Sequence, residues 1–556
     1  MAYLKRTRSK PDIGTSISIK RVLITDKVDP ILVDILKKGG LEVSQEKAAD
    51  EAELIKLLEN FDALIVRSAT KVTGKVIESS CKTLKLIGRA GTGVDNIDVK
   101  AATKCGVLVM NTPGANTISA AEHTVALLMA VARNIQQAAL TFKGQHKWAR
   151  SALSGTELQG KTIGILGLGR IGREVAKRCQ GFEMTTIGYD PVMPPEISIA
   201  AGIKPMSLEE VLARSDILSV HTPLLDSTRG LIGKKTLPLC KDGVIVINCA
   251  RGGIVDEDDL YDALESGKVG GAGLDVFVEE PPKDIPGNKL VNHPKCTVTP
   301  HLGASTQEAQ SKVAQEIANQ FLAISRGESS AGTINAPALS CAFDSEAKPW
   351  LTLAYSMGSI IGQLLTFGSA QLSVDKLGIT VQGPKLAKHI RGLKSASLAG
   401  FLNEFSDDRV NMVNADGIAE RMKIDVSMTN SDHPDETYQN LFSVEYKGSQ
   451  TKGVLRAAVF HDSGRIVQID DNYLELVPEG TMLVIRNKDK PGVAARISAI
   501  LFESNINISY LVLGRNSPVS ALTIIGLDSE PPQECLDKML AFDDITFAGL
   551  VHVPDV

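Results

Sequence analysis

The sequence contains no uninterrupted apolar run long enough to cross a membrane, and its first twenty residues lack the apolar segment of a secretory signal. Those residues carry five lysines and arginines against one aspartate. We therefore expect residues 1–20 to form a disordered leader rather than a targeting peptide.

The eight cysteines are scattered without a single CxxC pair. This spacing argues against a zinc site and against a disulfide framework, and it favours the reduced thiols of a cytoplasmic protein. The net charge of −5 gives no reason to expect nucleic acid or a membrane surface as partner. The composition, 43% hydrophobic and 22% charged, is typical of a globular protein. A chain of 556 residues is long enough for roughly three or four domains.

A glycine-rich segment between residues 161 and 172 is the most informative part of the chain. The apolar run Ile163–Leu166 predicts a buried strand, which leads through Gly167, Gly169 and Gly172 into a helical pattern beginning near Arg173. In a loop of this kind, the first glycine permits the tight turn, the second lets the backbone approach a pyrophosphate, and the third lets helix and strand pack closely. The segment predicts a dinucleotide site at a helix N-terminus.

A second strand, Thr185–Tyr189, ends in Asp190. A carboxylate there accepts hydrogen bonds from the adenosine ribose and repels a 2′-phosphate. The sequence therefore predicts NAD rather than NADP as the cofactor.

Basic residues directly follow two apolar strands in the first part of the chain. Ala63–Val66 leads into Arg67 and Lys71, and Leu86–Gly88 leads into Arg89. Because ligands in open α/β sheets collect at the carboxyl ends of strands, these side chains predict a site for a small, doubly anionic molecule. The alternative is a set of surface charges on loops.

A long apolar helix is expected to follow the strand that ends at Asn111. The spacing of Ser119 and Glu122 is that of a capping box at the start of this helix, which makes Glu122 structural and His123 a first-turn residue.

Three later strand ends supply a set of residues suited to oxidising a 2-hydroxy acid. His301 is the candidate base for the hydroxyl proton, and Glu280 is the carboxylate that would orient it. Arg251 would hold the substrate carboxylate and polarise the developing carbonyl. Taken singly, each has another interpretation: His301 as a helix cap, Glu280 as a surface charge, Arg251 as a pyrophosphate ligand.

From Arg21 to about Arg326 the chain resembles the D-isomer-specific 2-hydroxyacid dehydrogenases, and its sequence motifs are most similar to those of the phosphoglycerate dehydrogenases among them. The matching phrases begin at Arg67 (RSATKVT), Gly88 (GRAGTGVDN), Gly164 (GILGLGRIG), His221 (HTPLL), Asn248 (NCARGGIVD), Leu274 (LDVF) and Pro300 (PHLGAST).

The resemblance implies roles for particular residues. The catalytic residues would be Arg251, Glu280 and His301. The NAD contacts, together with the glycine loop, would be Thr92, Gly167, Gly169, Arg170, Ile171, Gly172, Asp190, Thr222, Pro223, Cys249, Ala250, Arg251, Asp275, His301, Leu302, Gly303 and Ala304. Substrate would meet Arg67, Arg89, Asn111 and Arg150, with the segment from Trp148 to Arg150 reaching across a dimer interface.

The C-terminal third has its own organisation. A Gly/Ser/Ala/Pro-rich stretch, Gly327–Ser340, is typical of a linker, and residues 341–475 loosely resemble the intervening domain of the long family members. Residues Thr481–Val553 show the strand and helix order of a ferredoxin-like fold and resemble an ACT domain. In serine-sensitive relatives this resemblance would place L-serine at Asn487, Asp489 and Asn507, although Asn487 departs from the His or Tyr usual there, and a purely assembling role is the alternative.

The expected architecture is α/β: a Rossmann-type doubly wound nucleotide-binding domain inserted in a flavodoxin-like substrate domain, then an α+β intervening domain and a ferredoxin-like ACT domain. The expected bounds are 21–115 with 300–330 for the substrate domain, 116–299 for the NAD domain, 331–476 for the intervening domain and 479–556 for the ACT-like domain.

The expected function is NAD-dependent oxidation of 3-phosphoglycerate to 3-phosphohydroxypyruvate, a step toward L-serine, by a homo-oligomer, tetramer or dimer, without a metal. Two alternatives remain: a glyoxylate, hydroxypyruvate or 2-oxoglutarate reductase of the same family, and an NAD-sensing protein of the corepressor type.

Overall fold

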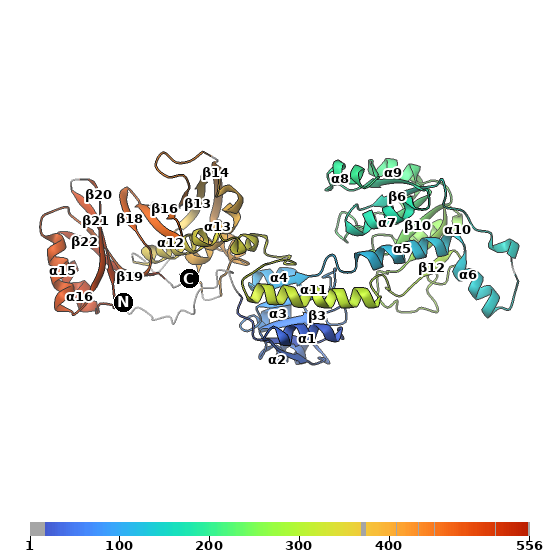
Figure 1. Ribbon diagram of the computed structural model, residues 1–556, viewed down its shortest axis with the longest axis horizontal. Coiled ribbons are helices and arrows are strands. Elements are labelled where there is room, and N and C mark those ends of the chain that lie inside the picture. The colour runs from blue at the N-terminus through green and yellow to red at the C-terminus, as the bar shows by residue number, and fades with distance from the viewer. Residues whose placement is uncertain are drawn as a thin grey trace. The chain divides into compact units, whose positions relative to one another are not determined.

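The computed structural model describes residues 17–148, 150–367, 374–406, 409–431, 433–449, 451–517 and 519–553 (Figure 1). Residue contacts divide the chain into two units, Met1–Asn111 with Ile317–Val556, and Thr112–Glu316. Most of the expected leader, residues 1–20, lies outside the described residues. Within the described residues no single helix has the length and apolarity to cross a membrane, and one bent helix pair, Thr117–Ala132 with Ile135–Gly144, meets the test by length and composition only.

The first sheet of the discontinuous unit has five parallel strands in flavodoxin-like order, which confirms the expected fold of this part. Across the sheet the strands are β2 (Glu42–Gln45), β1 (Arg21–Ile24), β3 (Ala63–Val66), β4 (Leu86–Arg89) and β5 (Leu108–Asn111). Its helices are α1 (Pro30–Lys38), α2 (Glu51–Leu58), α3 (Gly74–Ser80) and α4 (Val99–Lys104). The returning helix α11 (Gln307–Ser325) places Phe321 directly against Gly88 of β4, where a Cβ would collide with the ring.

The second unit is built on a seven-stranded parallel sheet. Across the sheet the strands are β12 (Cys296–Val298), β11 (Val269–Leu274), β10 (Val244–Asn248), β9 (Ile217–Val220), β6 (Thr162–Leu166), β7 (Thr185–Tyr189) and β8 (Lys204–Pro205). Numbered within the unit this is the Rossmann order 3-2-1-4-5-6 with one more strand, and the order reverses between β6 and β9. Nucleotides bind at that switch point in doubly wound folds.

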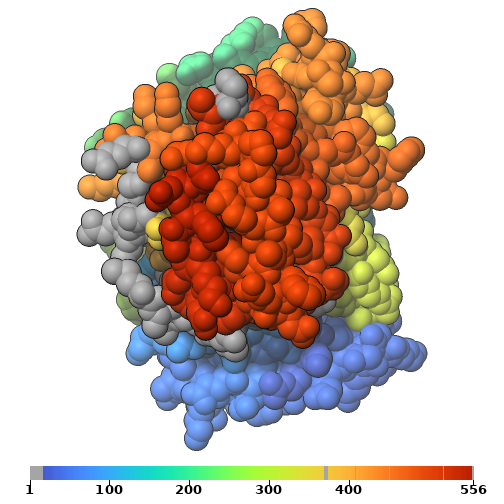
Figure 2. All heavy atoms as spheres, turned by 90° about the vertical axis from the view of Figure 1, so that its left-hand side faces the viewer, coloured from blue at the N-terminus to red at the C-terminus, as the bar shows by residue number. Residues whose placement is uncertain are grey.

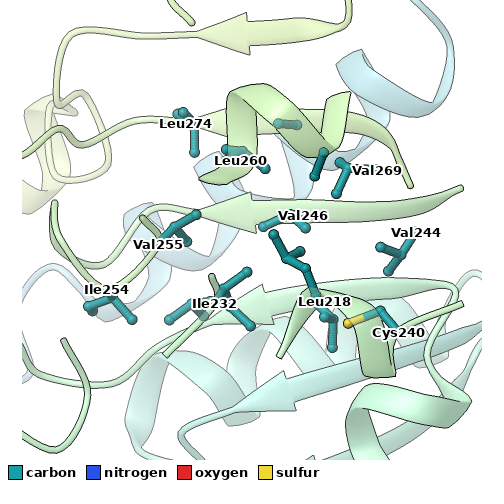
Figure 3. Close-up of a cluster of buried hydrophobic side chains, with 14 of the residues drawn as sticks. Leu218, Ile232, Cys240, Val244, Val246, Ile254, Val255, Leu260, Val269 and Leu274 are labelled. Carbon is teal, nitrogen blue, oxygen red and sulfur yellow. The ribbon is translucent and has the colours of Figure 1, made fainter. Parts of the chain in front are cut away.

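Helices cover this sheet and close its core. They are α5 (Thr117–Ala132), α6 (Ile135–Ala139), the π-helical turn η1 (Leu140–Gly144), α7 (Arg170–Gln180), α8 (Pro195–Ala200), α9 (Leu208–Arg214) and α10 (Glu257–Ser266). Figure 3 shows Leu218 and Val246 of neighbouring strands pointing into one apolar cluster with Leu260 of α10. Strands buried on both faces are continuous apolar runs, as these are.

The discontinuous unit continues with a six-stranded mixed sheet. Across it the strands are β14 (Asp425–Ser431), β13 (Val374–Gln382), β15 (Leu441–Gly448), β16 (Lys452–Phe460), β17 (Ser463–Ile469) and β18 (Asn472–Leu476). The accompanying helices are α12 (Lys348–Thr366), α13 (Ile390–Leu402) and α14 (Ala415–Arg421). Only β13 and β14 pair in parallel.

The chain ends in a four-stranded antiparallel sheet with two helices, the ferredoxin-like arrangement that the sequence predicts. Its strands lie in the order β20 (Ile508–Ser517), β21 (Ser520–Leu527), β19 (Gly480–Asn487) and β22 (Ile545–Val553), and its helices are α15 (Val493–Glu503) and α16 (Gln533–Leu540). Figure 2 shows the surface of this C-terminal part in orange and red.

Two local predictions are wrong. Helix α7 begins at Arg170, with Gly169 as its N-cap, and not near Arg173, because its first turn contains a glycine that hides the apolar period. The capping box at Ser119 does not exist: α5 already begins at Thr117, the Ser119 hydroxyl lies 2.8 Å from the hydroxyl of Thr306, and Glu122 pairs with Arg178 at 3.3 Å.

Candidate active site

The glycine loop between β6 and α7 forms a cradle that only glycine can make. Gly167 has φ +97°, and a Cβ there would lie 2.6 Å from the carbonyl oxygen of His221. At Gly172 a Cβ would collide with the Gly167 carbonyl oxygen. Gly169 caps α7, and no described side chain bonds to the first amides of that helix. These amides are suited to the pyrophosphate of a dinucleotide.

Asp190 lies at the end of β7, beside this loop. Its Oδ2 accepts a 2.8 Å hydrogen bond from the amide of Leu168, and its Oδ1 accepts from the amides of Val192 and Met193 at 2.9 and 3.1 Å. The carboxylate thus ties β7 to the glycine loop and retains lone pairs for ribose hydroxyls.

One buried polar atom at the neighbouring strand end has no partner among the described residues. It is the hydroxyl oxygen of Thr222, two residues after the end of β9. Buried hydroxyl groups are normally hydrogen bonded, so an unpaired one beside the switch point fits a bound polar group. Together with the glycine cradle, this atom makes the site compatible with NAD.

His301 and Glu280 meet in the second unit. Nδ1 of His301, three residues after the end of β12, lies 2.7 Å from Oε2 of Glu280. Oε1 of Glu280 accepts a 3.0 Å hydrogen bond from the amide of Phe277, in the loop that follows β11. The carboxylate is therefore fixed on one side by backbone and binds the imidazole on the other.

This pair shifts both pKa values. The hydrogen bond that His301 donates to Glu280 raises the pKa of His301, against the opposing effect of burial and of the positive charge on Arg251. For Glu280, burial favours the neutral acid, but the hydrogen bonds from His301 and from the Phe277 amide outweigh it, and the net pKa lies below the ordinary value. The Glu280 carboxylate is thus held ionised beside a base whose pKa is raised from its ordinary value.

Arg251 lies at the third strand end, after β10. Its Nη1 donates a 2.7 Å hydrogen bond to the Ala250 carbonyl, and its own carbonyl accepts from Nδ2 of Asn248 at 2.9 Å. The three predicted catalytic residues thus follow three neighbouring strands of one sheet, β10, β11 and β12.

Two other residues at these strand ends, His221 and Cys249, are of reactive types but have low reactivity here. Desolvation lowers the pKa of His221 to about 4, and its Nε2 lies 2.8 Å from the Ser219 hydroxyl. Burial raises the pKa of Cys249 to about 12. At neutral pH the first is a neutral imidazole of low basicity and the second an inert thiol.

The remaining predicted cofactor residues of this unit line the same strand ends. Asp275 follows β11 directly and is fully buried. Its carboxylate accepts hydrogen bonds from the amides of Leu302 and Gly303 at 2.7 and 2.8 Å. The others are Arg170 and Ile171 in the first turn of α7, Pro223 after β9, Cys249 and Ala250 after β10, and Ala304 in the turn before α11.

His123 lies in the same site, although the sequence motifs predicted only a structural position for it. Its Nε2 lies 3.2 Å from Oδ1 of Asp275 and 3.0 Å from the hydroxyl of Thr299. The apparent capping box predicted a helix start at this position instead. The signal that was available is a histidine on the first turns of a helix that directly follows a polar strand end.

The predicted substrate residues are divided between the units. Arg67 directly follows β3, and Arg89 and Asn111 are the last residues of β4 and β5 in the first sheet. Nδ2 of Asn111 donates to the carbonyl of Thr92 at 2.6 Å. Nε of Arg67 is buried and has no hydrogen-bond partner among the described residues. Arg150 begins a 3₁₀ turn in the other unit.

The three predicted effector residues lie in the C-terminal sheet and its loops. Asn487 is buried, its Oδ1 accepts from the Thr523 hydroxyl at 2.9 Å, and its Nδ2 donates to the carbonyl of Lys488. Asp489 pairs with Arg515 at 3.3 Å, and Asn507 donates to Asp528 at 2.6 Å.

Comparison with known proteins places this geometry in a family. Residues 125–303 match the family model of the D-isomer specific 2-hydroxyacid dehydrogenase NAD-binding domain, and residues 346–470 match that of the D-3-phosphoglycerate dehydrogenase intervening domain. The fold and the strand-end site therefore define an NAD-dependent dehydrogenase that acts on a CH–OH group.

Relatives narrow the class. A D-3-phosphoglycerate dehydrogenase of Archaeoglobus fulgidus is 38% identical over 96% of this chain and all of its own length, and one of Bacillus subtilis is 39% identical over the same shares. One of Sus scrofa is 49% identical over 72% of this chain and 73% of its own. The chain belongs to the D-3-phosphoglycerate dehydrogenase family.

Solved structures agree with the fold of the first part. A Thermus thermophilus protein, TT0316, is 35% identical with a TM-score of 0.52, covering 56% of this chain and 99% of its own. A glyoxylate reductase of Paecilomyes thermophila is 32% identical with a TM-score of 0.51, covering 56% of this chain and 97% of its own.

Proposed function

We propose that this protein oxidises the 2-hydroxyl group of 3-phospho-D-glycerate with NAD, giving 3-phosphohydroxypyruvate for L-serine synthesis. The observation that carries the proposal is the 2.7 Å hydrogen bond between His301 and Glu280, set beside Arg251 at the strand ends that follow a dinucleotide cradle. The names of the full-length relatives supply the substrate.

His301 acts as the base. With Nδ1 held as a donor to Glu280, the lone pair of the neutral imidazole is on Nε2, and the hydroxyl proton of the substrate moves there. The ionised Glu280 stabilises the imidazolium as it forms. NAD, when bound, supplies the hydride acceptor.

Arg251 positions the substrate. Its guanidinium offers five N–H donors in a planar fork, and the bond from Nη1 to the Ala250 carbonyl fixes the orientation of that fork. In this role it binds the substrate carboxylate and stabilises negative charge that develops on the adjacent oxygen.

Arg67 and Arg89 would recognise the phosphate. Arg67 follows β3 and Arg89 is the last residue of β4, and the buried Nε of Arg67 is a donor that a phosphate oxygen would satisfy. The test is NAD reduction with 3-phosphoglycerate beside D-glycerate. We expect a strong preference for the phosphorylated acid in the wild type and a loss of that preference in Arg67→Gln, while Lys56→Gln, an exposed charge on α2, behaves as the wild type.

Other outcomes of this assay point elsewhere. Equal rates with both acids would remove phosphate recognition. Turnover confined to glyoxylate, hydroxypyruvate or 2-oxoglutarate would indicate a reductase of the same family, and binding of NAD without turnover of any of these would indicate a sensor.

We further propose that L-serine is an effector, bound at Asn487, Asp489 and Asn507 in a homo-oligomer. The argument is the position of these residues at the loops of a ferredoxin-like sheet. Serine titrated into the assay should inhibit, D-serine should not, and Asn507→Ala should be insensitive; an L-serine titration without effect contradicts the proposal.

Oligomer formation is supported by an exposed aromatic pair. Trp148 is 82% exposed, and its ring lies 5.7 Å from that of Phe142 in an edge-to-face contact. Large exposed aromatic side chains are typical of interfaces. Light scattering should give the mass of a dimer or tetramer, and a monomeric mass contradicts this.

The eight free thiols support a cytoplasmic location.

A further inference from the structure

A second pair of histidine and carboxylate, His123 and Asp275, lies in the same unit as His301 and Glu280. Nε2 of His123, on α5, faces Oδ1 of Asp275 at 3.2 Å and Oγ1 of Thr299 at 3.0 Å. The Thr299 hydroxyl itself donates to Oδ1 of Asp275 at 2.6 Å. Since both neighbours of Nε2 are acceptors toward it, the network assigns the ring proton to Nε2.

Asp275 organises the turn that carries His301. Its carboxylate accepts from the amides of Leu302 and Gly303 at 2.7 and 2.8 Å, and its main-chain carbonyl accepts from the amide of His301 at 2.8 Å. Three consecutive amides therefore bond to one residue, which is itself fully buried.

The turn needs this support. His301 has φ +54°, in the left-handed region that residues with a Cβ seldom adopt, and it adopts this conformation while placing its imidazole against Glu280. Such a conformation persists when the surrounding bonds fix it. The backbone amides of residues 301–303 bond to Asp275, and the His301 amide also bonds to the Thr299 carbonyl. The side chains of Asp275 and Thr299 both bind His123.

Burial makes the ionisation of Asp275 depend on its donors. Desolvation would raise its pKa, but hydrogen bonds from His123, Thr299 and the two turn amides outweigh burial and bring the pKa below its ordinary value. His123 is the one ionisable donor in that set, and its side chain is mostly buried.

We propose that His123 is a positioning residue for the dehydrogenation: by donating from Nε2 to Asp275 and Thr299 it holds the 299–303 turn, and through it the imidazole of His301, in the reactive orientation. This inference rests on the proposed function. It assigns His123 no contact with substrate or cofactor.

The test compares variants that keep or remove the donor. His123→Leu removes it, and we expect kcat to fall roughly tenfold, because a lost hydrogen bond to a buried charge misplaces the base. His123→Gln keeps an N–H donor and should recover most of the rate. Glu122→Gln, one residue away and paired with Arg178, is the control and should keep the wild-type rate.

Thr299→Val supplies a second route to the same turn. It should lower kcat as well, and the double variant with His123→Leu should lose less than the product of the two single effects, since both act on Asp275. Melting temperatures of all variants are measured beside the kinetics.

Several results would overturn the inference. They are a wild-type kcat in His123→Leu, equal losses in the Leu and Gln variants, or independent effects of His123 and Thr299. If His123→Leu does not fold, the comparison of Gln and Thr299→Val with the wild type still decides. A wild type without turnover on 2-hydroxy acids would instead refute the proposed function.

Discussion

At the scale of single residues, environment decides which histidine is the base. His301 has a carboxylate partner that raises its pKa, whereas desolvation lowers the pKa of His221 to about 4. Both follow strands of one sheet, and the sequence alone does not separate them by spacing. A neighbouring carboxylate in the loop after β11 separates them, and Glu280 was predictable because it follows a buried strand.

The first prediction concerns His301 itself. His301→Ala removes the proton acceptor, so kcat for the oxidation should fall by roughly two to four orders of magnitude. The variant should still bind the reduced cofactor, NADH, because the glycine cradle is untouched. The fluorescence of NADH measures this binding. An unaltered rate would exclude His301 as the base.

The second prediction concerns pH. Oxidation requires neutral His301, so the rate rises with pH through the histidine pKa, which Glu280 raises. Glu280→Gln removes the negative charge, lowers that pKa and moves the rising limb to lower pH. The plateau rate should also fall, by about one to three orders of magnitude, because imidazolium loses its counter-charge. A pH profile of kcat/KM measures both effects; an unmoved limb contradicts the assignment.

At the scale of elements, the sequence predicted buried strands well and helix starts less well. Strands β3 and β7 have the predicted bounds, because each is a short buried run that ends at a charged residue, Arg67 or Asp190. The predicted start of helix α5 was wrong. Ser119 and Glu122 have the spacing of a cap, yet tertiary partners, Thr306 and Arg178, engage both side chains.

The contact of β4 with α11 gives the third prediction. Gly88→Ala would push a methyl group into the ring of Phe321, and overpacking of this kind costs about 1–3 kcal/mol. Urea unfolding should show a lower midpoint at unchanged m-value. Because Arg89 is the next residue of β4, KM for 3-phosphoglycerate should rise as well.

Gly417 provides the matched control for that substitution. It lies in helix α14, and a Cβ there meets nothing within 4 Å. Gly417→Ala should leave activity unchanged and stabilise by about 0.5–1 kcal/mol, the helix preference of alanine. Equal stability of the two variants would contradict the packing argument.

At the scale of the whole molecule, the insertion of one domain into another was predicted only from the resemblance to the dehydrogenase family. The contacts leave the first unit at Asn111 and return to it at Ile317, whereas the predicted bounds of the inserted domain are 116 and 299. Helix α11 spans the return, and a continuous helix gives no local signal of a change of unit. The predicted intervening domain, 331–476, likewise extends past both ends of the matching region 346–470.

Division into two units predicts how NAD affects unfolding. A ligand at a hundred times its Kd stabilises the unit that binds it by about 2.7 kcal/mol, which for a unit of this size raises its melting temperature by roughly 5–10 °C. The glycine cradle and Asp190 lie in Thr112–Glu316, so calorimetry should show one transition moving with NAD and another staying. The two tryptophans assign them, since Trp148 lies in this unit and the buried Trp350 in the other. In Trp148→Phe the remaining fluorescence follows Trp350 alone and should report the unmoved transition. If Trp350 instead melts later in NAD by the full amount, the units unfold as one and the cofactor stabilises the entire chain.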